Sequence, residues 1–265
     1  MAIREFLASR KADCKRLVEL LGREFAYVSV LGSDVTTKTV VVNRNTSRVE
    51  TDADADKGFT VKMTDGRAFF EYSLDDVSGD IDGLAAKIIR ECGVADSLKK
   101  DMIKSCPIAD EPLTKSFERK NDLGDFTDAQ LLEACTAIKD AIISKSENVL
   151  NASAILRTLD VNKIFISKNR SLEQAYTWVN GIMLVNYREG DKMVGAREGE
   201  CSHLLGEVLA GMPQKVDKLV NKAQKLVTAQ PIIPGVYDVI TDPSVTGLLA
   251  HEAFGHGVEM DMFVK

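Results

Sequence analysis

Hydrophobic residues at helical spacing mark the start of the chain. Apolar side chains in 3–21 recur every three or four positions, and Gly22 is suited to end the helix. A second amphipathic helix is predicted over 81–89. Between the two helices the residues are typical of strands, and Asp65 with Gly66 fits a hairpin turn that needs positive φ at both central residues. The predicted strands cover 25–31, 37–43, 59–64 and 68–72.

The same order of elements is predicted a second time, after a weakly patterned stretch. Thr127 and Gln130 fit a capping box at the start of a helix. Pro213 suits the first turn of a later helix, and Asn180 with Gly181 indicates a turn between strands. The predicted strands cover 153–158, 162–167, 174–179 and 181–187. The apolar faces of the two helices comprise Leu131, Cys135, Ile138 and Ile142 in the first, and Val216, Leu219, Val220, Ala223 and Val227 in the second.

Helix, meander and helix therefore occur twice along the chain. Because the helices flank runs of hairpins instead of alternating singly with strands, the pattern predicts an α+β fold with mixed or antiparallel sheets. We expect an N-terminal α+β subdomain over 1–110 and a second α+β subdomain over 111–265, which leads into a final helix.

Composition narrows the class of protein. The 265 residues are 45% hydrophobic and 28% charged, which is typical of a soluble globular protein. The net charge of −6 gives no general attraction to phosphate backbones, so direct binding of nucleic acid is not expected. The start has no apolar core like that of a signal peptide, and no segment is long and apolar enough to cross a bilayer. The five cysteines are scattered and never form a C-x-x-C pair, so we expect a cytoplasmic protein without a membrane partner.

The final helix follows a predicted strand at 236–240. Asp242 can cap this helix, and Pro243 suits its first position. The side that it buries is expected to comprise Val245, Leu248 and Leu249.

This helix carries the residues with the clearest chemistry, His251, Glu252 and His256, in an H-E-x-x-x-H pattern. Neutral imidazoles are good zinc ligands, and a glutamate beside the first histidine can act as general base on a metal-bound water. Two histidines that only cap or pack a helix end are the alternative interpretation of the same pattern.

The spacing of the two histidines constrains any shared metal. Residues four apart on a regular α-helix lie about 40° apart around the axis, whereas residues five apart lie about 140° apart. His251 and His256 can therefore bind one metal only if the helix widens into a π-type turn between them or ends near Gly255. Glycine tolerates such a distortion.

The residues around this pattern resemble a known family. The block 247–261 is similar to the signature block of the TldD/PmbA family, formerly labelled modulators of DNA gyrase, and the preceding 231–242 matches as well. The segment 56–67 is more loosely similar to the family's N-terminal glycine-and-strand motif. In this family the histidine–glutamate block belongs to the TldD-like branch, and the PmbA (TldE-like) partner lacks it.

The resemblance implies a TldD-type zinc metallopeptidase. It implies that His251 and His256 are zinc ligands and that Glu252 is the catalytic base. The expected substrates are peptides or unfolded chains, held in extended form by strand addition to a sheet edge. The expected assembly is a homodimer or a heterodimer with a PmbA/TldE-like subunit. The alternative function is that of a non-catalytic interaction or regulatory subunit, in keeping with the gyrase-modulator label.

One departure from the family concerns the third metal ligand. Members are much longer, and the expected third ligand is a cysteine far downstream, beyond Lys265. The chain therefore looks like an N-terminal portion with an incomplete metal site, and we expect it to be inactive alone. Glu259 is an internal candidate for the third ligand. A carboxylate at this position more often orients a ligating histidine through a hydrogen bond and does not bind the metal itself.

Overall fold

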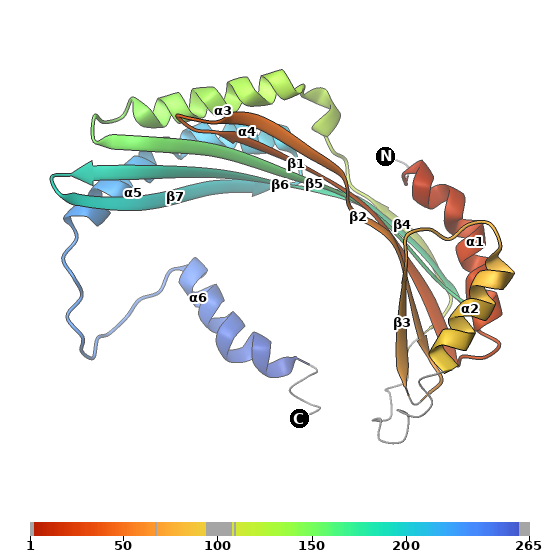
Figure 1. Cartoon of the computed structure of the whole chain (residues 1–265). Helices are drawn as coiled ribbons and strands as arrows, with labels where there is room; N and C mark the ends of the chain where they lie inside the picture. The colour runs from red at the N-terminus through yellow and green to blue at the C-terminus, as the bar shows by residue number, and fades with distance from the viewer. Residues whose placement is uncertain (1–2, 67, 94–107, 109, 260–265) are drawn as a thin grey trace. The chain divides into compact units, whose positions relative to one another are not determined.

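A computed structural model describes residues 3–66, 68–93, 108 and 110–259. Two helix–meander–helix units follow one another along the chain, as predicted (Figure 1). The first unit comprises α1 (Glu5–Leu21), β1 (Tyr27–Val42), β2 (Ser47–Thr64), β3 (Phe69–Leu74) and α2 (Ile81–Gly93). The second comprises α3 (Asp128–Ile143), β5 (Val149–Ser167), β6 (Arg170–Glu189), β7 (Lys192–Ser202), α4 (Leu205–Gln214) and α5 (Val216–Thr228). Between the units lie β4 (Leu113–Glu118) and a short 3-10 turn, Leu123–Asp125.

Both meanders join a single seven-stranded sheet. Its strand order is β3-β2-β1-β5-β6-β4, and β7 also pairs with β6. All pairings are antiparallel except that of β4 with β6, which is parallel. The long antiparallel pairing of β1 with β5 connects the two units. The predicted α+β class is confirmed. Where mixed or antiparallel sheets were expected, the described strands form one mixed sheet.

The helices cover one face of this sheet (Figure 1). Val28 and Val30 of β1 lie under α1 and α2, and Val40 and Val42 of the same strand lie in the core that α3, α4 and α5 cover. Successive side chains on a strand point to opposite faces, so these four even-numbered positions share a face. One side of a single sheet therefore carries two hydrophobic cores in succession.

The predicted helices agree well with the structure. Thr127 and Gln130 form the capping box of α3, with both reciprocal hydrogen bonds present. The predicted apolar faces of α3 and α5 are buried. Pro213 is a correction, because it lies in the last turn of α4 and not in the first turn of a helix. The break comes after it, where the Lys215 N–H donates to the carbonyl of Met212, and α5 begins at Val216.

The predicted strands are fragments of longer ones, and one predicted turn is wrong. Asn180 and Gly181 lie inside β6. Gly181 allows a close approach there, because a Cβ atom would come within 2.4 Å of Met212 Sδ on α4. A hairpin turn forms at Asp65 and Gly66, since β2 ends at Thr64 and Thr64 pairs with Phe69. Only Gly66, with φ +88, has the positive φ that was predicted for both residues. Strand β7 was not predicted, and only Ala196 among its residues is buried.

Residues 229–265 form a second compact unit, separate in its contacts from 1–228. It contains α6 (Pro243–Ala250), a π-helical turn, η3 (His251–Gly255), and a 3-10 turn, η4 (His256–Val258). The strand predicted at 236–240 is not formed, because no strand of the described residues pairs with this segment. The apolar side of α6 that was expected to be buried is exposed at Val245, Leu248 and Leu249. The strands on both sides of residue 110 share one sheet. The subdomain boundary predicted there stays a prediction.

Among the helices in the described ranges, none combines the length and the apolar character needed to span a bilayer.

A polar cluster lies between the two cores on the helix-covered face. Arg4, at the start of α1, donates from Nη1 to Asp34 Oδ1 at 2.8 Å and from Nη2 to Asp160 Oδ2 at 2.7 Å. The side chain of Asp34 is 6% exposed and that of Asp160 is 15% exposed. Asp34 is on β1 and Asp160 is on β5, so one guanidinium ties α1 to the strand pair that joins the two units.

We expect Arg4→Met to lower the free energy of unfolding by roughly 2–3 kcal/mol, because it leaves two poorly solvated carboxylates without their cation. Arg16→Met on the same helix is the control, since Arg16 and its partner Asp82 have side chains that are 53% and 62% exposed. An exposed pair of this kind contributes about 0–1 kcal/mol. Urea unfolding measures both values, and equal losses for the two variants would contradict the structural role of Arg4.

Candidate metal centre

The candidate centre begins with a well-formed helix start. Asp242 caps α6, and its Oδ1 accepts a hydrogen bond from the Val245 N–H at 3.0 Å. Pro243 occupies the first turn, where its missing N–H leaves no hydrogen bond unmade. The predicted cap is therefore confirmed, and the helix places His251 directly after its last residue, Ala250.

The backbone between the two histidines is widened, as the spacing requires. Residues His251–Gly255 form a π-helical turn, and the N–H of His256 donates to the carbonyl of His251, five residues earlier. The extra residue in this turn offsets the rotation that a regular helix would place between the two side chains. The rings lie 4.6 Å apart between centroids, at 69° to one another. The prediction of a π-type turn is confirmed.

Gly255 does not supply unusual backbone geometry to this turn. Its φ of −57 and ψ of −51 are ordinary right-handed helical values. A Cβ atom at this position would stand 3.6 Å from His251 Nδ1, which is normal van der Waals contact. The π turn therefore does not depend on the conformational freedom of glycine, contrary to what the sequence suggested.

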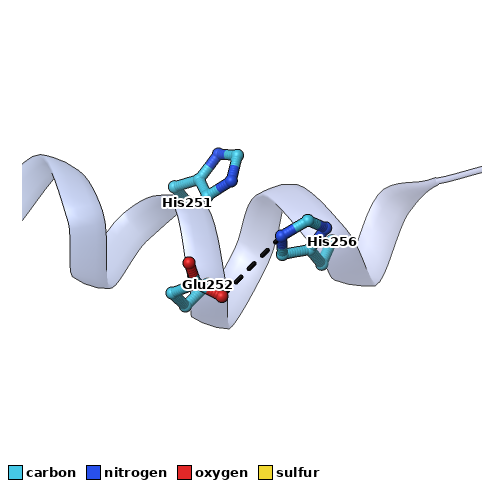
Figure 2. A group of neighbouring side chains, drawn as sticks. All are labelled: His251, Glu252 and His256. Carbon is cyan, nitrogen blue, oxygen red and sulfur yellow. Dashed lines mark ion pairs between the residues drawn. The ribbon is translucent and has the colours of Figure 1, made fainter.

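His256 has a carboxylate near each ring nitrogen. Its Nδ1 lies 2.7 Å from Glu259 Oε1, and its Nε2 lies 3.7 Å from Glu252 Oε2 (Figure 2). The hydrogen bond to Glu259 places the proton of a neutral ring on Nδ1 and leaves the Nε2 lone pair directed toward Glu252. Glu259 therefore contacts the His256 ring and is not one of the three residues whose ligand atoms lie within 4.8 Å of one another.

The three predicted residues come together as one group. Ligand atoms of His251, Glu252 and His256 all lie within 4.8 Å of one another, and all three residues are exposed. Two nitrogens on one tetrahedral zinc ion lie roughly 3.4 Å apart, given Zn–N distances of about 2.0–2.1 Å. Two imidazoles and a carboxylate within 4.8 Å of one another are a donor set that suits a divalent cation.

Comparison with known proteins bears on what this group does. No family model matches the chain. A metalloprotease from Archaeoglobus fulgidus is 28% identical over 132 residues, which is 46% of this chain and 31% of the relative. A metalloprotease from Synechocystis is 31% identical over 99 residues, which is 37% of this chain and 21% of the relative. A third, from Methanothermobacter thermautotrophicus, is 43% identical over 45 residues, 17% of this chain and 10% of the relative.

Solved structures share the fold at low sequence identity. A candidate modulator of DNA gyrase from Bacteroides thetaiotaomicron has a TM-score of 0.72 at 14% identity, over 93% of this chain and 56% of its own. TldE from Thermococcus kodakarensis has a TM-score of 0.61 at 13% identity, over 80% of this chain and 47% of its own.

The resemblance to the TldD/PmbA family is confirmed. The α+β fold is that of the TldE and gyrase-modulator structures, and the similar curated proteins are metalloproteases. The chain matches about a third or less of the length of these metalloproteases and about half of the solved structures. The metal ion and the protease chemistry of these relatives therefore reach this chain only as a proposal, as do the particular roles of the three residues.

A pair of length variants tests whether the π turn holds the centre together. Deleting Ala253 places the histidines four residues apart, about 40° around a regular helix. We expect this variant to bind Co²⁺ within about threefold of the unaltered chain, because both rings still share a face. Inserting one alanine after Ala253 places them six residues apart, about 120° from alignment.

We expect the insertion variant to lose about tenfold or more in affinity, since only one ring can reach the ion. Visible absorption during Co²⁺ titration measures all three proteins. Equal affinities across the series would mean that the two histidines do not share the metal.

Proposed function

We propose that this chain carries the ligand-bearing part of a zinc-dependent peptidase of TldD type. The observation that supports the proposal most directly is the π turn, which brings His251 and His256 together beside Glu252. The similarity of the chain to curated metalloproteases points to the same chemistry.

In this proposal His251 and His256 hold the zinc ion, and Glu252 is the general base. Zinc, when bound there, acts as a Lewis acid and lowers the pKa of a coordinated water to about 7. Glu252 takes the proton of the attacking water on its carboxylate and passes it to the leaving amine. Glu259, hydrogen-bonded to His256 Nδ1, keeps the opposite nitrogen of that ring available.

We further propose that residues beyond this chain complete the metal site. Catalytic zinc sites ordinarily use three protein ligands, and the described residues bring two histidines together here. Glu259 is already engaged with a histidine ring. The resemblance to the TldD/PmbA family implies a cysteine beyond Lys265, which is the third ligand in this proposal. Residues 1–265 alone then bind zinc weakly and show no peptidase activity.

The proposed substrates are peptides or unfolded chains in the cytoplasm. Edge strands of the sheet offer main-chain hydrogen-bonding groups to an extended peptide, without strong preference for its sequence. The proposed assembly is a homodimer or a heterodimer with a PmbA/TldE-like subunit.

A non-catalytic regulatory subunit is the second candidate. The Bacteroides structure, named as a candidate gyrase modulator, matches 93% of this chain in fold and supports it. The two candidate functions differ in whether they need Glu252, because a regulatory subunit does not require a general base beside its histidines.

We expect Glu252→Gln to retain bound zinc and to lose about a hundredfold to ten-thousandfold in kcat on peptides. Glutamine preserves the size of the side chain but cannot take up the proton. The measurement uses a protein extended to the length of the matched metalloproteases, with zinc content determined by elemental analysis.

Glu24→Gln provides the matched control, because Glu24 is exposed and lies in the other compact unit. Loss of zinc from Glu252→Gln would make Glu252 a ligand instead of a base. Unchanged peptidase activity in that variant would favour the regulatory candidate.

A further inference from the structure

One edge of β6 has a gap between its two partner strands. The side chains at this gap lie on the sheet face opposite the helices. Strands β4 and β7 both pair with β6, but at different points along it (Figure 1). Pairing with β4 ends at Ala175, and pairing with β7 begins at Val179. A hollow of about 430 Å³ lies at this gap, lined by Phe117, Arg119, Gln174, Tyr176, Trp178 and His203.

His203, the residue after β7, fixes one wall of the hollow through hydrogen bonds. His203 Nδ1 lies 2.7 Å from the carbonyl oxygen of Thr177, to which it donates, and the Thr177 hydroxyl donates to the carbonyl of His203 at 2.6 Å. The imidazole ring packs against Trp178, with ring centroids 4.0 Å apart. This reciprocal pair of hydrogen bonds fixes the indole and the imidazole as one wall.

The opposite wall is both aromatic and cationic. Phe117 of β4 is 42% exposed, and the Arg119 guanidinium lies 5.6 Å from the centre of its ring. Arg119 has no carboxylate partner among the residues that the structure describes. An unpaired guanidinium beside exposed aromatic rings is suited to bind a planar apolar group and a carboxylate together.

The hydrogen-bonding groups of the residues that line the hollow favour a ligand that accepts hydrogen bonds. The indole N–H of Trp178 has no hydrogen-bond partner within the described part of the chain, and neither has the hydroxyl of Tyr176. Arg119, Trp178 and Tyr176 are therefore three lining residues whose side chains can donate hydrogen bonds. The single cation and the net charge of −6 disfavour a nucleic-acid strand, whose phosphates need a run of cations.

We propose that this hollow is a binding site for a peptide segment in which an aromatic side chain adjoins a carboxylate. The ring stacks on Trp178, and the carboxylate pairs with Arg119. The carboxylate is either the C-terminus of a peptide that ends in an aromatic residue or an acidic side chain next to one. The site stands independently of the proposed peptidase function, because none of its residues belongs to the candidate metal centre.

The tryptophan fluorescence of the protein reports on this site alone, since Trp178 is the only tryptophan of the 265 residues. We titrate the protein with N-acetyl-phenylalanine and with N-acetyl-phenylalanine amide, and follow tryptophan fluorescence. The acid is expected to saturate the signal and to bind about tenfold more tightly than the amide, because only the acid can pair with Arg119. N-acetyl-leucine, which lacks the ring, is expected to bind more weakly than N-acetyl-phenylalanine.

Acetyl-Phe-Glu-amide separates the two sources of the carboxylate. Tighter binding of this peptide than of N-acetyl-phenylalanine assigns the site to an internal acidic residue, and the reverse order assigns it to a C-terminus. Either order supports the proposal if the Arg119→Gln variant binds the tighter of the two probes no more tightly than the unaltered protein binds N-acetyl-phenylalanine amide.

Arg197→Gln is the control for charge loss, because Arg197 is exposed on β7, and the paired strands place it on the same face. An unchanged urea midpoint verifies that Arg119→Gln is folded. The proposal is overturned if acid and amide bind equally, if Arg119→Gln changes nothing, or if single-stranded oligothymidylate binds through Arg119 more tightly than the peptides.

Discussion

The widened turn between His251 and His256 is the constraint on which every part of the candidate metal centre depends. Five residues of regular winding would leave the two imidazoles about 140° apart, and no single ion could bind both. The observed i→i+5 hydrogen bond removes this separation and sets the rings 4.6 Å apart. The same turn keeps Glu252 within reach of His256, and the 3-10 turn that follows brings Glu259 to the far side of that ring.

π turns are rare and are found mostly at functional sites, because they exchange a good hydrogen-bond pattern for a particular placement of side chains. Nothing in the backbone of Gly255 makes this one obligatory, since its dihedral angles suit any residue. The shared placement of two imidazoles and a carboxylate is therefore the physical reason we assign to the turn.

Periodic features of the sequence predicted the helices better than the sheet. The buried residues of α3 and α5 recur at helical spacing, so the apolar pattern records their packing directly. Gly181 was misread as part of a turn because a glycine admits both a turn and the close approach of another element. The apolar segment 236–240 resembles a strand, yet a strand forms only where a partner lies alongside. The pairing of β1 with β5 is set by packing between distant parts of the chain, which a local pattern does not encode.

The backbone between the two histidines was easier to predict than the pairing of the strands. Spacing alone required a π turn or a helix end, and the structure contains the π turn. The hydrogen bond between His256 and Glu259 could be found only from coordinates, since a carboxylate three residues after a histidine can also be a metal ligand.

Zinc-edge X-ray absorption of the chain loaded with one equivalent of zinc tests the central claim most directly. Shared coordination by His251 and His256 predicts two imidazole nitrogens at about 2.0–2.1 Å, with the outer-shell scattering of both rings. This imidazole signal is predicted to fall to one ring in His251→Ala and to one ring in His256→Ala. A spectrum that shows oxygen ligands alone, or that is unchanged in both variants, would contradict a metal centre at this turn.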